Sequence, residues 1–338
     1  MAAFTFGSVF TTWVASPVGI GLSVALVASY GAGIVAGARR GAGVPVLRAL
    51  VFLVLGVGSL LLAADGGLAA YRDTSFPAAA AQSAVLAAIT PIGLALGDPV
   101  GVVRRALGEE RARPVLRVLS GKVARVVMFP LLASVVATAL HLLLFVTPWL
   151  AESLAHAWVR ELTYLVLLGT GLLFVMPLLA DELVPAWCTP PLRALIGFAD
   201  GLLDAVPGVV VMASPALLGA PVAAYLAAAD PMYQQRVGGT AMFAIAECVG
   251  LPLLAATVVA WVRYDAKEAA AVDAALDAER LRRRAAAVAD GAVLDGVAAD
   301  GAVTRDVEAE LDRPWWETDP RFTRRAPHGG GPAGATDT

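Results

Sequence analysis

Histidine, cysteine and charge are all scarce in this chain. Its 338 residues include three histidines and two cysteines, and charged residues make up only 16% of the chain. The cysteines, Cys188 and Cys248, lie in unrelated segments and form no CxxC motif, so the sequence indicates neither a zinc site nor a dithiol redox centre. No Gly-rich loop joins a strand to a helix as phosphate-binding loops do, and no Ser/His/Asp arrangement suits nucleophilic catalysis.

Apolar residues, in contrast, fill the chain. They make up 58% of it and gather in stretches of near-bilayer length, separated by charged or Pro/Gly-rich joints. A helix needs about 20 apolar residues to cross a bilayer, and in lipid it satisfies its own backbone hydrogen bonds. The sequence therefore predicts an all-α fold, a polytopic membrane bundle of about seven transmembrane helices. The expected spans are 17–36, 46–64, 76–96, 123–146, 157–179, 195–217 and 240–262.

The distribution of arginine and lysine predicts the orientation of the bundle. Basic residues concentrate in the joints after the first and third spans, around Arg39 and across 104–125, while the alternate joints carry only Arg72, Arg160 and Arg236. Because positively charged joints stay on the cytoplasmic side, we expect the N-terminus outside and the C-terminus in the cytoplasm. The basic joint should face anionic lipid headgroups in the plasma membrane, and nothing indicates binding to nucleic acid.

Two parts follow from this pattern: a seven-helix transmembrane domain over 1–262 and a cytoplasmic segment over 263–338. Residues 263–287 are rich in alanine and charge and predict a polar helix. The remaining tail has too few apolar residues to build a core and is expected to be largely disordered. Within it, Trp315-Trp316 is either an aromatic patch at the headgroup boundary or a short partner-binding motif.

Three acidic residues inside predicted spans are the first functional candidates, because an ionisable group in a membrane is costly. Asp200 and Asp204 have i, i+4 spacing, which places both carboxylates on one helix face, and Glu247 lies in the last span. Two nearby carboxylates in a low dielectric repel, so the pair should hold a proton or share a cation. They either form a site or line a wet groove between helices. We expect this face to point toward Glu247 or Arg160.

Four residues are candidate metal ligands: His141, His156, Met242 and Cys248. His141 and His156 could approach each other across the joint between two spans, and Met242 and Cys248 could supply soft sulfur to Cu(I) beside Glu247. Each also has an ordinary role in packing or hydrogen bonding, and two histidines do not complete a site.

A series of landmarks runs along residues 10–265. They are Trp13, Pro17 and Tyr30; Arg39-Arg40, Pro45 and Arg48; Tyr71; FPAAAAQSAVLAAITPIGLALGDP at 76–99; LLFVMPLLADELVP at 172–185; and Asp230-Pro231, Tyr233-Gln234-Gln235, Gly238-Gly239 and Met242. In this order they resemble the CtaG family of cytochrome c oxidase assembly factors, seven-helix membrane proteins implicated in copper supply.

The resemblance implies an accessory or assembly factor for a respiratory oxidase, with oxidase subunits or other membrane assembly proteins as partners and copper as the implied metal. The family's histidine positions, however, align with Ala79, Ser83, Arg160, Tyr164 and Asp204. The competing hypothesis is an ion- or proton-coupled transporter of a small solute that uses the intramembrane carboxylates. No catalytic constellation favours an enzyme.

Overall fold

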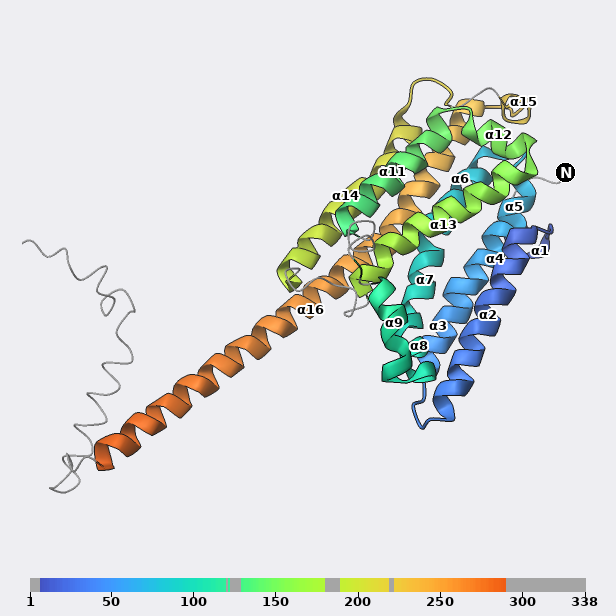
Figure 1. Ribbon diagram of the computed structural model, residues 1–338. Helices are drawn as coiled ribbons and strands as arrows, with labels where there is room; N and C mark the ends of the chain where they lie inside the picture. Colours follow the sequence, from blue (N-terminus) through green and yellow to red (C-terminus); the bar gives the residue numbers. More distant parts are fainter. Residues whose placement is uncertain (1–6, 120, 122–128, 180–188, 219–221, 290–338) are drawn as a thin grey trace, which may run out of the picture. The chain divides into compact units, whose positions relative to one another are not determined.

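The computed structural model describes residues 7–119, 121, 129–179, 189–218 and 222–289, and these are helical apart from short connections (Figure 1). Cys188 and the Trp315-Trp316 pair lie outside the described residues, as does the tail from 290. The helices are α1 (Ser8–Thr11), α2 (Pro17–Ala38), α3 (Val46–Val51), η1 (Phe52–Gly58), α4 (Ser59–Ala64), α5 (Gly67–Tyr71), α6 (Phe76–Ala84), η2 (Val85–Ile89), α7 (Thr90–Leu96), α8 (Pro99–Leu107), α9 (Glu109–Leu119), α11 (Pro130–Val146), α12 (Trp149–Ala155), α13 (Ala157–Leu179), α14 (Pro190–Ala213), α15 (Ala223–Leu226) and α16 (Pro231–Ala289).

Among the described residues, six helices are long and apolar enough to cross a membrane. They are Pro17–Ala38, Val46–Tyr71, Phe76–Leu107, Ala157–Leu179, Pro190–Ala213 and Pro231–Arg283. A seventh span forms if Leu131–Val146 and Trp149–Ala155, which are bent by 70°, count as one. The prediction of an all-α membrane bundle with about seven transmembrane helices is therefore confirmed. Its orientation in the membrane stays a prediction.

The predicted boundaries of the last two spans were shifted toward the C-terminus. Helix α14 begins at Pro190 rather than at 195, because proline is well suited to the first helical position. It ends at Ala213, since Ser214 precedes a proline and takes an extended conformation. Helix α16 begins at Pro231 rather than at 240, where the Asp230 carboxylate accepts a hydrogen bond of 2.9 Å from the Tyr233 backbone N–H.

Close helix crossings at glycine hold the bundle together. A Cβ atom added to Gly56 in η1 would lie 2.9 Å from the backbone nitrogen of Leu94 in α7. At the crossing of α14 and α16, a Cβ on Gly239 would lie 2.5 Å from the Met212 nitrogen. In both places only glycine lets the two backbones come so near, which is how membrane helices gain van der Waals contact.

A short turn between α7 and α8 is fixed by Asp98, which adopts a left-handed conformation with φ 54°. Its Oδ1 accepts a hydrogen bond of 2.9 Å from the Gly101 N–H, which caps α8. Its Oδ2 pairs with Arg48 at 2.5 Å and with Arg105 at 2.9 Å. Asp98 therefore anchors α8 to the start of the second span.

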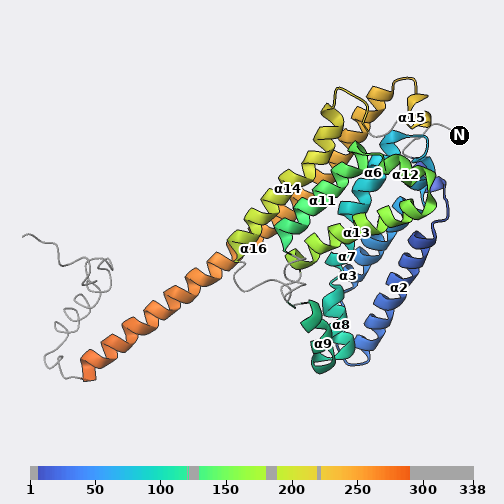
Figure 2. The same cartoon turned by 45° about the horizontal axis from the view of Figure 1, so that its top comes forward.

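The bundle buries a core of apolar side chains and leaves other apolar side chains on its surface. Phe145, Leu60 and Leu86 are almost completely buried. Val54 and Leu195, in contrast, are 69% and 62% exposed, as expected where a helix faces lipid. Helix α2 packs against α4 and α8, and α11 lies beside α14 in both views (Figures 1 and 2).

The chain divides into two compact units, Met1–Trp261 and Val262–Thr338. The described part of the second unit is the C-terminal portion of α16, and its side chains are mostly exposed. Ion pairs one turn apart run along it, including Arg280–Asp277 at 3.2 Å and Arg283–Glu279 at 3.0 Å. Such pairs stabilise a solvated helix by a few tenths of a kcal/mol each, roughly 0.2–0.5.

Candidate functional site

A small cavity lies inside the bundle, enclosed by α11, α13, α14, α16 and the third span. Its volume is about 50 Å³. Roughly 10–15 Å³ on this measure suffices for one water, so the cavity has room for a few water-sized particles and excludes an organic solute. The residues that line it are Ala84, Ala87, Ala88, Ser134, Ala137, Thr138, His141, Gly171, Phe174, Val175, Asp200, Asp204, Pro207, Met242, Ala246, Val249, Gly250 and Leu253.

Helix α14 presents both predicted carboxylates to this cavity. Asp200, Asp204 and Pro207 have i, i+4, i+7 spacing and all three line it, so they form one stripe of the helix. The Asp200 side chain is 4% exposed. The structure thus places the acidic pair in the bundle interior, where the sequence pattern predicted a shared face.

Helix α11 supplies a second polar stripe that the sequence analysis missed. Ser134, Thr138 and His141 also have i, i+4, i+7 spacing and line the same cavity. The spacing of three polar residues in an otherwise apolar span was the available signal. The hydroxyls of Ser134 and Thr138 are buried without a hydrogen-bond partner in the described part of the protein. The Ser134 hydroxyl lies near the Asp200 carboxyl group but does not reach hydrogen-bond geometry.

The hydrogen-bond partners of His141 fix which ring nitrogen carries the proton. Its Nε2 lies 2.9 Å from the Ser83 hydroxyl oxygen. Ser83 donates its own hydrogen to the Ala80 carbonyl at 2.8 Å, so it can only accept from the histidine. Nε2 is therefore the donor, and in the neutral ring Nδ1 is left as the unprotonated nitrogen.

The structure separates the other candidate ligands. Met242 is buried and lines the cavity, whereas Cys248 is exposed, so the two sulfur atoms do not face one site. Glu247 does not line the cavity but is near enough to Asp204 to interact electrostatically. His156 is exposed and pairs with Glu152 at 3.1 Å, away from the cavity residues around His141. The described residues contain no group of three or more His, Cys, Asp or Glu side chains placed to hold a metal ion.

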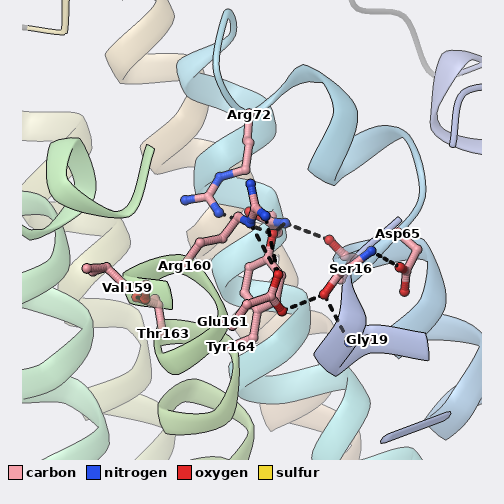
Figure 3. Close-up of polar contacts among 11 residues, drawn as sticks. Ser16, Gly19, Asp65, Arg72, Val159, Arg160, Glu161, Thr163 and Tyr164 are labelled. Atoms are coloured by element: carbon pink, nitrogen blue, oxygen red, sulfur yellow. Dashed lines mark hydrogen bonds and ion pairs between the residues drawn. The ribbon is translucent and has the colours of Figure 1, made fainter. Parts of the chain in front are cut away.

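A second polar cluster, which we call the arginine network, surrounds Arg72 (Figure 3). Arg72 is only 3% exposed. Its guanidinium donates to the Tyr164 hydroxyl at 3.1 Å and to the Ser153 hydroxyl at 2.7 Å, and it lies 5.6 Å from the centre of the Tyr164 ring. Gln82 donates to the Tyr164 hydroxyl at 2.8 Å and to the Ala63 carbonyl at 2.6 Å. The Tyr164 oxygen thus connects the fifth span to Gln82 in the third span and to Arg72, which directly follows the second.

Tyr225 in helix α15 contacts this network. The Tyr225 hydroxyl donates to the Arg72 carbonyl, and its ring meets Phe76 edge-on at 5.7 Å between centroids. Burial raises the pKa of Tyr225 above its usual range, because the phenolate would lose its hydration. Tyr225 therefore stays a hydrogen-bond donor at physiological pH.

Next to the arginine network, Ser16 ties the first span to two others (Figure 3). Its hydroxyl caps α2 by accepting from Gly19 N–H at 3.0 Å and donates to Glu161 at 2.6 Å. Its backbone N–H donates to the Asp65 carboxylate at 2.7 Å. Arg160 pairs with Glu161 at 3.3 Å and therefore does not act as the partner of the acidic pair. Of the two neighbours expected for the Asp200–Asp204 face, Glu247 or Arg160, the described contacts give Glu247 as the one that interacts with Asp204.

The residues at the family's histidine positions do not fit a copper ion. Ala79 offers no donor atom, and the Ser83 hydroxyl is bonded to Ala80 and His141. The Tyr164 oxygen accepts from two donors, one of them the positively charged Arg72 guanidinium, which would repel a cation. Arg160 brings a second positive charge. The fifth position holds Asp204, a hard oxygen ligand. Copper is bound in proteins by imidazole and soft sulfur, and neither occurs at these five positions.

Comparisons with known proteins identify the family of the chain. Residues 28–264 match the family described as cytochrome c oxidase caa3 assembly factor (Caa3_CtaG). Two similar proteins are uncharacterized protein Mb0105 of Mycobacterium bovis and uncharacterized protein MT0111 of Mycobacterium tuberculosis, each 26% identical over 287 residues. This covers 81% of the chain and 43% of each relative, so the chain spans less than half the length of the curated relatives it matches. No solved structure matches the chain significantly. Because the family match covers well over half of its residues, the chain belongs to the cytochrome c oxidase caa3 assembly factor family.

Proposed function

We propose that this protein is an accessory factor in the plasma membrane that assists assembly of cytochrome c oxidase, and that it acts through contacts rather than catalysis. The observation that carries the proposal is the family match over residues 28–264, which includes all the spans between the first and the last and a part of each of those two. The proposed partners are oxidase subunits or other membrane assembly proteins.

The surface of the bundle supports a role in helix–helix contact. Along α2, Gly21 and Gly31 have open space where a Cβ would lie, and Val24 and Val27 beside them are exposed. Small residues on a membrane helix let a second helix approach closely. This face of α2 is therefore suited to a transmembrane segment of a partner as well as to lipid.

We do not extend copper handling to the membrane core. Of the family's histidine positions, Tyr164 lies in the arginine network with its oxygen already hydrogen-bonded, and Arg160, paired with Glu161, places a positive charge beside it. The proposal is that this chain keeps the assembly scaffold and uses its interior for another purpose.

A second candidate function is supported by the acidic cavity. Asp200 and Asp204 face a volume of about 50 Å³, which suits ions or protons and excludes organic solutes in this conformation. An ion- or proton-conducting carrier is therefore the alternative to an assembly factor.

Deletion of the gene separates the two candidates. In the deletion strain we expect less assembled oxidase on native gels and lower oxidation of reduced cytochrome c by membranes, both restored by the full chain. A normal oxidase level together with a defect in ion-dependent growth would contradict the assembly role and favour the carrier. In the same assay, Asp204→Asn tests the cavity. Glu152→Gln, an exposed acid-to-amide change, is its matched control.

A further inference from the structure

The cavity combines a buried carboxylate, Asp200, and a half-buried one, Asp204, with unsatisfied hydroxyls. Asp200 and Asp204 face it from α14, and Ser134 and Thr138 face it from α11. The two hydroxyl oxygens are buried, with Ser134 1% and Thr138 7% exposed, and neither has a hydrogen-bond partner among the described residues. Buried polar atoms are mostly satisfied in proteins. Among the buried atoms of the described residues that are not, these two hydroxyls lie with two carboxylates on one cavity, an arrangement that a bound species would complete.

The charge around the cavity indicates the sign of that species. None of the described residues that line it is lysine or arginine. His141 already donates its Nε2 hydrogen to Ser83. Glu247, near Asp204, adds negative rather than positive charge. A carboxylate buried without a countercharge is costly in a membrane interior, so the pair holds a proton, a cation or both. The unpaired hydroxyl oxygens of Ser134 and Thr138 beside it favour a cation, which they can coordinate.

The donor atoms indicate the chemical class of the cation. Copper and zinc prefer imidazole and sulfur, and the cavity lining holds one imidazole, that of His141, whose Nε2 is already bonded to Ser83. Carboxylate and hydroxyl oxygens are hard ligands, typical of alkali and alkaline-earth ions, and four side chains of the lining carry them. The only sulfur that lines the cavity belongs, among the described residues, to the thioether of Met242. The cavity of about 50 Å³ accommodates one ion with a water or two.

We propose that this cavity binds a single hard cation through the carboxylates of Asp200 and Asp204 and the hydroxyls of Ser134 and Thr138. The ion is either a divalent cation, which neutralises both carboxylates, or a monovalent cation such as Na⁺ together with a proton. It joins α11 to α14 in the bundle interior. This proposal does not depend on the proposed role in oxidase assembly, because cation binding is measured on the purified protein alone.

Thermal unfolding of the purified full chain tests the proposal. The protein is stripped with a chelator, and Na⁺, K⁺, Mg²⁺ or Ca²⁺ is added as the chloride, with choline chloride holding the ionic strength constant. One cation should raise the Tm saturably, by roughly 3–6 °C, since a ligand that binds only the folded state stabilises it by mass action. Equilibrium dialysis with the same ion should give one ion per chain. A rise in Tm with Ca²⁺ or Mg²⁺ would indicate the divalent cation, and a rise with Na⁺ would indicate the monovalent cation together with a proton.

Variants locate the ion. Ser134→Ala combined with Thr138→Val removes two ligands without removing charge and should weaken the apparent affinity at least tenfold. Thr170→Val is the matched control, because the Thr170 hydroxyl bonds to its own helix at Val166 and does not line the cavity. Equal Tm in all salts, unchanged affinity in the double variant, or preferential binding of Cu(I) would each overturn the proposal. If Asp204→Asn fails to fold, the hydroxyl variants still decide the matter.

Discussion

Replacement of Tyr164 by phenylalanine tests whether the arginine network holds the bundle together. The change removes one oxygen and keeps the ring, so it leaves the packing intact. That oxygen accepts from Arg72 at 3.1 Å and from Gln82 at 2.8 Å, and Arg72 is only 3% exposed. A hydrogen bond that involves a charged group contributes roughly 1.5–3 kcal/mol, and a buried donor left unpaired costs a similar amount.

The two donors keep some of their partners, which limits the loss. Arg72 retains Ser153 and Gln82 retains the Ala63 carbonyl. We therefore expect Tyr164→Phe to lower the free energy of unfolding by about 2–3 kcal/mol. For a chain of this size, that loss corresponds to a fall in Tm of roughly 3–5 °C. The measurement is thermal unfolding of the purified protein in one detergent.

Tyr233→Phe is the matched control, because Tyr233 is 60% exposed at the start of α16. Its free energy of unfolding should stay within about 0.5 kcal/mol of that of the unchanged protein, as for most surface substitutions. If Tyr164→Phe is equally harmless, the phenol oxygen does not stabilise the fold, and the structural role assigned to the arginine network is wrong.

Three further predictions concern topology, copper and helix crossing. A single cysteine at Glu110, in a background without native cysteines, should resist an impermeant thiol reagent in intact cells and react after lysis, because the basic joint is expected in the cytoplasm; labelling from outside would reverse the predicted orientation. Purified protein equilibrated with Cu(I) and then dialysed should retain well under one copper per chain by metal analysis, and tight one-to-one binding would refute the account of the histidine positions. Gly239→Leu should prevent stable folding, because its Cβ would lie 2.5 Å from the Met212 nitrogen, whereas Gly21→Ala, in open space, should leave the folded yield in detergent unchanged.

The helical spans could be predicted from the sequence because lipid imposes one strong rule. An apolar stretch of bilayer length has to satisfy its own backbone, so the fifth span, Ala157–Leu179, was predicted at its observed limits. The ends of α14 and α16 were harder, since they depend on local features. Proline at the first helical turn and the side-chain cap from Asp230 extended both helices into segments that look polar or irregular.

Of the candidate site, the carboxylates could be predicted from the sequence but the hydroxyls could not. A lone aspartate in an apolar run stands out because its charge is costly, so Asp200 and Asp204 were identified. Ser134 and Thr138 were not identified from the sequence, because a hydroxyl in a membrane helix usually bonds to its own backbone, as the Thr170 hydroxyl does. Only the packing of α11 against α14 shows that these two hydroxyls face the carboxylates. Likewise, no local pattern links Arg72 to Tyr164, which is 92 residues away.

The hydroxyl groups of the arginine network and those of the acidic cavity differ in their hydrogen bonding. In the arginine network, the phenol of Tyr164 accepts from two donors and Ser153 both accepts and donates, although the Arg72 Nε is buried without a partner in the described part of the protein. In the cavity, two buried hydroxyls have no partner. Removing a satisfied group leaves its partner unpaired and destabilises the fold, whereas removing an unsatisfied one costs little or even stabilises the protein. Without a cation, the Ser134→Ala and Thr138→Val change should therefore leave the Tm unchanged or raise it, and the difference from the unchanged protein should appear only when the cation is added. A large loss of stability in the stripped protein would mean that these hydroxyls already have partners, and that the cavity is a packing feature.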